Sequence, residues 1–99
     1  MIKTRPFDIA AQLDSPEMIA GYLSEAFETG DASYISHALG MVARAKGMAA
    51  LAKQAGLSRE SLYKALSSEG RPEFITILKV MKALELDLKV ETSKEHATT

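Results

Sequence analysis

Side chains suited to binding nucleic acid are concentrated between residues 48 and 71 of this 99-residue chain. Arg59 and Glu60 could read base edges, because a guanidinium can fork onto guanine and a carboxylate can accept a hydrogen bond from cytosine. Lys64 lies one helical turn after Glu60. Groups suited to phosphate oxygens are Ser61, Tyr63, Lys53, Arg71 and the backbone amides near Met48. This combination predicts a surface that contacts duplex DNA.

The stretch from 48 to 66, MAALAKQAGLSRESLYKAL, predicts two short helices that meet at a sharp angle and would position these groups. Leu51, Ala52 and Ala55 share one apolar face of the first helix. Gly56 suits the left-handed residue that ends it. The small Ala52 would let the two helices cross closely.

The second helix of the pair should begin after Ser58, whose hydroxyl can cap it, while Leu57 lies under the corner. Leu62, Ala65 and Leu66 would then face inward. This spacing resembles a helix-turn-helix of the phage-repressor type. The alternative is an ordinary helical hairpin, because such corners also occur without DNA.

The average charge conceals an uneven distribution. The formal net charge is −1, which argues weakly against nucleic acid, because binding to phosphates is driven by counterion release. Residues 1–31 carry two basic and six acidic side chains, whereas residues 32–71 carry six basic and two acidic ones. The positive segment contains the helix pair, as expected for a localised nucleic-acid surface.

Helical periodicity predicts three further helices. One starts at Ser15 and Pro16 and ends at Gly30, one starts at Asp31 or Ser33 and ends at Gly47, and a last one starts near Pro72 or Glu73. Their predicted buried stripes are Ile19, Tyr22, Leu23, Ala26 and Phe27, then Ile35, Ala38, Leu39, Val42 and Ala43, and finally Phe74, Ile77, Leu78, Met81 and Leu84. We therefore expect an all-α, five-helix bundle.

The two ends of the chain should lie outside the helical bundle. We expect an N-terminal arm and short helix over residues 1–14, the domain over 15–90, and a disordered tail over 91–99. Leu88 and Val90 alternate with Asp87 and Lys89, which predicts a short strand. A lone strand needs a second copy or a partner's sheet edge, so we expect a homodimer. The alternative is an extended tail.

The sequence offers no combination of residues for catalysis. It has no cysteine, no phosphate-binding glycine motif, and two histidines, His37 and His96, without companion ligands. We expect neither an enzyme nor a metal or cofactor site. No apolar run is long enough for a membrane span, and residues 1–6 lack a signal-peptide core. The protein is expected to be cytoplasmic.

The chain also resembles a family of small bacterial antitoxins, the addiction-module antidote proteins, over nearly its whole length. The resemblance is carried by PFD at 6–8, YL at 22–23, GD at 30–31, AL at 38–39, GLSRESLYKAL at 56–66 and EGRPEF at 69–74. It implies a repressor-like helix-turn-helix fold. It also implies a protein that neutralises a co-expressed toxin similar to the RelE and HigB ribonucleases, and that represses its own operon by binding operator DNA.

The acidic first third of the chain is a candidate surface for such a toxin. A toxin that cuts RNA must hold phosphates with basic residues, so carboxylates could meet it by charge complementarity. The candidates are Glu17, Glu25, Glu28 and Asp31. They could equally form a solvated helix face. Two other functions remain open: a stand-alone phage-type repressor without a toxin, and a helical adaptor without DNA.

Overall fold

The computed structural model describes residues 13–67, 69 and 71–93. These residues form five helices and no strand, which confirms the all-α prediction for this part of the chain. The helices are α2 (Pro16–Glu28), α3 (Ala32–Lys46), α4 (Met48–Ala55), α5 (Arg59–Ala65) and α6 (Phe74–Ala83). The predicted arm and short N-terminal helix lie outside the described residues, except for residues 13 and 14.

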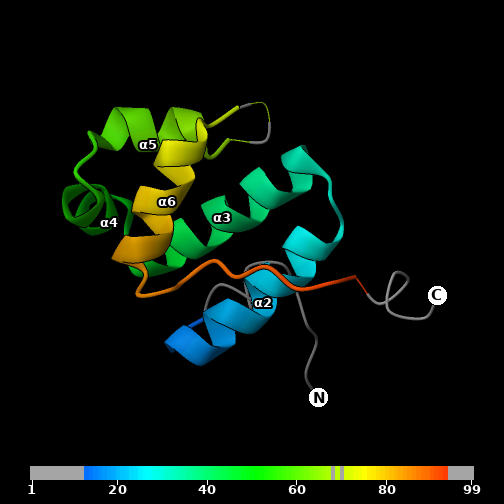
Figure 1. Cartoon of the computed structure of the whole chain (residues 1–99). Helices are drawn as coiled ribbons and strands as arrows, with labels where there is room; N and C mark the ends of the chain where they lie inside the picture. The colour runs from blue at the N-terminus through cyan, green and yellow to red at the C-terminus, as the bar shows by residue number, and fades with distance from the viewer. Residues whose placement is uncertain (1–12, 68, 70, 94–99) are drawn as a thin grey trace, which may run out of the picture.

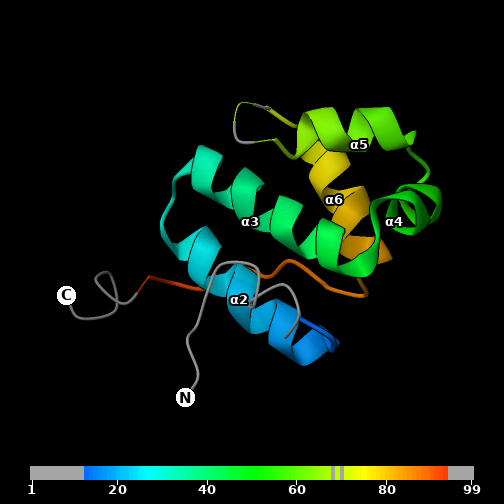
Figure 2. The same ribbon diagram turned by 180° about the vertical axis from the view of Figure 1, so that it is seen from behind.

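Helix α3 is the central rod of the fold (Figure 1). Helix α2 packs along one side of α3, and α4, α5 and α6 lie together toward the C-terminal end of α3. Seen from behind, the same separation holds: α2 lies apart from α5, with α3 between them (Figure 2). The acidic N-terminal helix and the polar second helix of the corner are thus on different sides of the molecule.

Short polar side chains begin three of the helices, as the sequence predicts. The Ser15 hydroxyl accepts a hydrogen bond from the Met18 amide at 3.2 Å. The Asp31 carboxylate accepts hydrogen bonds from the amides of Ser33 and Tyr34. Each bond satisfies a first-turn amide that has no partner within its own helix. Positive φ values at Gly30, Gly47 and Gly56 end α2, α3 and α4.

The core is built from side chains of all five helices. Ile19 and Leu23 come from α2, Leu39 and Val42 from α3, and Leu62 from α5. The remaining described core members are Leu13, Ala26, Ala38, Ala43, Met48, Leu51, Ala52, Leu62, Leu66, Val80, Met81 and Leu84.

Helix α6 differs from its prediction in the face that it buries. Val80, Met81 and Leu84 are buried, but Phe74 is 69% exposed and Leu78 is 38% exposed. Because Ile75 and Val80 are also apolar, α6 has two possible apolar stripes, and the contact with α4 selects the one that contains Val80. The predicted burial of Phe74 and Leu78 is therefore wrong.

After α6 the chain turns sharply and runs back across α2 (Figure 1). The amide of Glu85 donates to the carbonyl of Lys82 and that of Leu86 to the carbonyl of Met81, both at 2.9 Å, and Glu85 has φ of 66°. This is a Schellman turn with a residue other than glycine in the left-handed position. Leu86 then packs against the core.

The short strand predicted at Asp87 to Val90 is absent from the described structure, where residues 86–93 have no regular secondary structure. A strand needs a neighbouring edge, and the described part of a single chain offers none. The segment is extended instead, and the Val90 side chain is 99% exposed.

None of the described helices combines the length and apolarity that crossing a membrane requires.

Candidate nucleic-acid interface

The corner between α4 and α5 is closed by backbone hydrogen bonds. The amide of Leu57 donates to the carbonyl of Ala52 at 2.8 Å, and the amide of Gly56 donates to the carbonyl of Lys53 at 3.2 Å. This pair is a complete Schellman turn around Gly56, whose φ is 75°. The turn fixes the angle at which α5 leaves α4.

Helix α5 separates an apolar side from a polar one. Leu62 is fully buried and Leu66 is 3% exposed, so both anchor the helix to the core. At its start the Ser61 amide donates to the Ser58 hydroxyl at 3.0 Å, as predicted, and the Ser58 hydroxyl donates to the Ser61 hydroxyl at 2.8 Å. The exposed side chains of α5 are Arg59, Glu60, Ser61, Tyr63 and Lys64. The structure thus brings five predicted site residues onto one short helix.

Arg59 and Tyr63 contact each other on this exposed surface. The guanidinium carbon of Arg59 lies 5.7 Å from the centre of the Tyr63 ring, within the range of a cation–π interaction. The two residues are four apart, so they are neighbours on one helix face. The contact restricts the orientations open to the guanidinium. The sequence predicts a phosphate contact for Tyr63 but not this pairing with Arg59.

A glycine inside α3 sets how closely α5 approaches. A Cβ atom at Gly40 would lie 2.8 Å from the Leu66 carbonyl oxygen, which is closer than such atoms approach in proteins. Only a residue without a Cβ lets the end of α5 rest on α3. The sequence signal was a glycine within an otherwise regular helix, where it costs about 0.5 to 1 kcal/mol relative to alanine.

Two residues of α4 are predicted to contact DNA, and only one of them has an exposed side chain. Lys53 is exposed in the last turn. The Met48 side chain is buried at 8% exposure and belongs to the core, so only its backbone amide is available to a phosphate. No side chain caps the start of α4.

The structure places Arg71 in a different environment from the α5 residues. It lines a groove of about 880 Å³ between the start of α3 and the start of α6. The groove has an apolar floor that includes Phe27, Ile35 and Ile77, and its rim carries Asp31 and Glu69. Arg71 is exposed.

The acidic candidates for toxin binding lie on α2 and just before α3. Glu17, Glu25 and Glu28 are exposed on α2. Asp31 is also exposed, but its carboxylate caps α3, which gives that residue a structural role independent of any partner.

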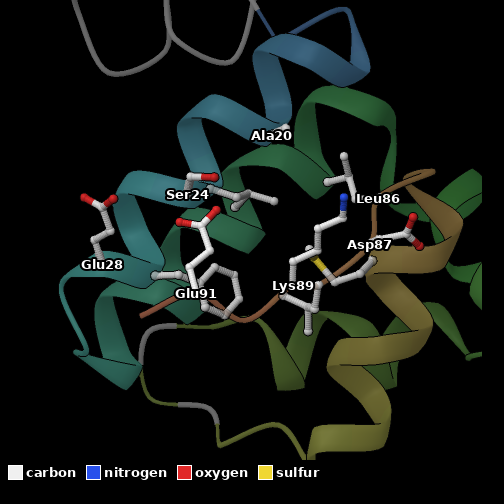
Figure 3. A pocket seen from close by; sticks show the side chains of 11 residues that line it. Ala20, Ser24, Glu28, Leu86, Asp87, Lys89 and Glu91 are labelled. Atoms are coloured by element: carbon white, nitrogen blue, oxygen red, sulfur yellow. The ribbon is translucent and has the colours of Figure 1, made fainter. Parts of the chain in front are cut away.

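Glu28 lies at one end of a second groove, of about 510 Å³, formed by α2 and the segment after α6. Figure 3 shows Glu28 on α2, with Asp87, Lys89 and Glu91 along the opposite wall. Leu23 and Met81 lie at its apolar floor. The groove therefore has carboxylates from two separate elements on its rim.

The described residues show no arrangement for holding a metal. Within 13–67, 69 and 71–93, no three histidine, cysteine or carboxylate side chains come together.

Tyr22 is partly buried between α2 and α3, and burial, followed by the charge of Tyr34, raises the pKa of its phenol. This group lies away from α5.

Comparison with known proteins gives two matches. The family described as "Probable addiction module antidote protein" matches residues 3–92. An uncharacterized protein of Haemophilus influenzae is 48% identical over 90 residues, which cover 91% of this chain and 93% of that protein. No solved structure matches the chain.

Proposed function

Because the chain belongs to the family of probable addiction module antidote proteins, we propose that it binds and neutralises a cognate toxin and represses its own operon. Members of this family are antidotes rather than enzymes, so the chain is a non-catalytic antitoxin. The proposed toxin is a ribonuclease similar to RelE and HigB. The chain would meet both the toxin and its operator DNA in the cytoplasm.

The observation that supports DNA binding is the division of α5 between Leu62, which is fully buried, and a polar flank whose side chains are exposed. In a helix-turn-helix of the phage-repressor type, the second helix enters the major groove with its N-terminal residues toward the bases. Here this orientation would bring Arg59 and Glu60 to base edges. Nearby bases or phosphates would be contacted by the other candidate side chains of the two helices, namely Lys64, Ser61, Tyr63 and Lys53.

Two copies are proposed to bind one operator. A single α5 of seven residues can reach about half a turn of DNA, so a homodimer would read two half-sites about one helical turn apart. Arg71 and the Met48 amide are assigned to phosphates at the edge of each half-site.

One preparation tests both halves of the proposed function. The full chain is co-expressed with the product of the reading frame adjacent to its gene, purified through a tag on that product, and tested for shifting a duplex from upstream of its own gene. We expect the two proteins to co-purify and the duplex to shift, with affinity falling steeply as salt increases. A chain that co-purifies but never shifts the duplex would contradict repression, and a chain that shifts DNA but captures no toxin would indicate a stand-alone repressor.

A further inference from the structure

The exposed side of α6 is the most apolar helical surface that the structure leaves uncovered. Phe74 is 69% exposed, Ile75 53% and Leu78 38%. Residues three and four apart are neighbours on a helix, so these three side chains form one stripe, which we call the α6 stripe. In Figure 1 no other described helix passes in front of α6, and in Figure 2 it lies behind α3 and α5. No helix among the described residues therefore covers its outer side.

Charges of opposite sign flank the two ends of the α6 stripe. Glu73 is exposed immediately before the helix, whereas Lys79 and Lys82 are exposed in its second half. Lys82 lies four residues after Leu78 and thus on the same side of the helix. The surface therefore changes from acidic through apolar to basic along one axis.

Such a surface is complementary to itself when one copy is reversed. A twofold axis perpendicular to α6 would make the two α6 helices antiparallel. The apolar middle of one stripe would then pack against that of the other. Glu73 of each copy would lie near Lys82 of the other. Isologous contacts of this kind are how most homodimers associate. The antiparallel arrangement also opposes the two helix dipoles favourably.

We propose that the α6 stripe is the contact between two copies of this chain, with Leu78 close to the twofold axis. This inference deepens the two-copy reading of the operator proposed above, and it replaces the C-terminal strand as the dimer contact. Its test requires neither DNA nor toxin, so it can fail while the proposed function stands.

Residue 78 allows a test that depends on symmetry. In Leu78→Glu or Leu78→Lys alone, two like charges would face each other across the axis, and sedimentation equilibrium of the full chain should show the dimer dissociation constant raised about 100-fold. An equal mixture of the two variants should recover the dimer, because each pair then carries opposite charges. Circular dichroism should show unchanged helix content, since Leu78 does not belong to the buried core.

Two further substitutions serve as matched controls. Met18→Glu changes an apolar side chain of similar exposure, 48%, on α2, and Val90→Glu changes the exposed residue of the extended segment. Both variants should remain dimeric. A wild-type chain that is monomeric at about 100 μM, a range in which specific homodimers associate, would overturn the inference. So would a dimer that survives Leu78→Glu, or one that is lost in Val90→Glu.

Discussion

At the residue scale, the position of Arg59 on α5 predicts that this side chain distinguishes one base pair from another. The position of Lys53 on α4 predicts that it contributes affinity for any DNA duplex. Arg59→Ala should cost about 1 to 3 kcal/mol at one base pair and relax the preference there, because a forked guanidinium distinguishes guanine from the other bases. Lys53→Ala should weaken all duplexes alike and reduce the salt dependence. Binding isotherms on single-base operator variants measure both effects.

The control for this pair is Lys89→Ala, which removes a lysine from the segment after α6, beside α2 rather than α5. It should leave the isotherms unchanged. If Arg59→Ala retained both the affinity and the base preference of the wild type, α5 would not be the reading helix.

Tyr63 is predicted to act through Arg59 rather than on DNA alone. Its ring lies 5.7 Å from the guanidinium carbon and limits the directions in which Arg59 can point. Tyr63→Leu should therefore loosen the preference at the base pair read by Arg59, whereas Tyr63→Phe, which keeps the ring, should retain it.

A double-mutant cycle separates this positioning role from an independent phosphate contact. With Arg59 already replaced by alanine, Tyr63→Leu should have little further effect on base preference. Equal losses from Tyr63→Leu with and without Arg59 would show that the two side chains act separately.

At the element scale, Gly40 determines the distance between α3 and α5. Gly40→Ala places a Cβ atom 2.8 Å from a backbone carbonyl oxygen, and we expect an unfolding free energy lower by about 1 to 2 kcal/mol, after allowing for the better helix propensity of alanine. Operator affinity should fall as well, because α5 would be displaced.

Gly21 provides the matched comparison on α2. It is exposed within the helix, and a Cβ atom there would meet nothing within 4 Å. Gly21→Ala should thus raise the unfolding free energy by about 0.5 to 1 kcal/mol. Chemical denaturation of both variants measures the contrast, and equal effects at the two glycines would contradict the close approach at Gly40.

The turn after α6 is strained by its residue type. Glu85 has φ of 66°, a conformation that costs an L-residue about 1 kcal/mol or more. Glu85→Gly should raise the unfolding free energy by about 0.5 to 1 kcal/mol. Thermal unfolding of Glu85→Gly beside Glu85→Ala provides the measurement, since alanine removes the charge and keeps the strain. Equal melting temperatures for the two variants would indicate that φ carries no cost here.

The elements that sequence analysis predicted well are those set by neighbouring residues. Ser15, Asp31 and Ser58 cap helices, and Gly30 and Gly56 end them, because each acts within four residues of itself. The polar flank of α5 followed from the inward leucines of the same short helix.

What could not be predicted depends on contacts between distant elements. Either apolar stripe of α6 fits a helix, and only packing against α4 decides that Val80 is buried and Phe74 is not. The close approach of Gly40 to the end of α5, and the groove at the start of α3 that Arg71 lines, depend in the same way on residues far away in sequence.

At the scale of the whole molecule, the acidic helix α2 and the DNA-binding candidate α5 lie on different sides of α3. Basic and polar groups occupy α5, whereas Glu17, Glu25 and Glu28 occupy the exposed part of α2. With the α6 stripe used for pairing, one protein could hold a second copy, DNA and a basic toxin on three separate surfaces. This arrangement would let the operator and the toxin bind at the same time.

The separation of charge predicts that toxin binding can be removed without loss of DNA binding. Reversing two carboxylates in Glu25→Lys/Glu28→Lys should weaken capture of a basic toxin at least about tenfold, since complementary charges become like charges. Operator affinity should be retained or slightly increased. The neutral pair Glu25→Gln/Glu28→Gln should lie between wild type and reversal, as a charge effect requires. Co-purification and the operator shift, measured on the same preparations, check both outcomes; a toxin still captured and inhibited by the reversed variant would exclude α2 as its binding surface.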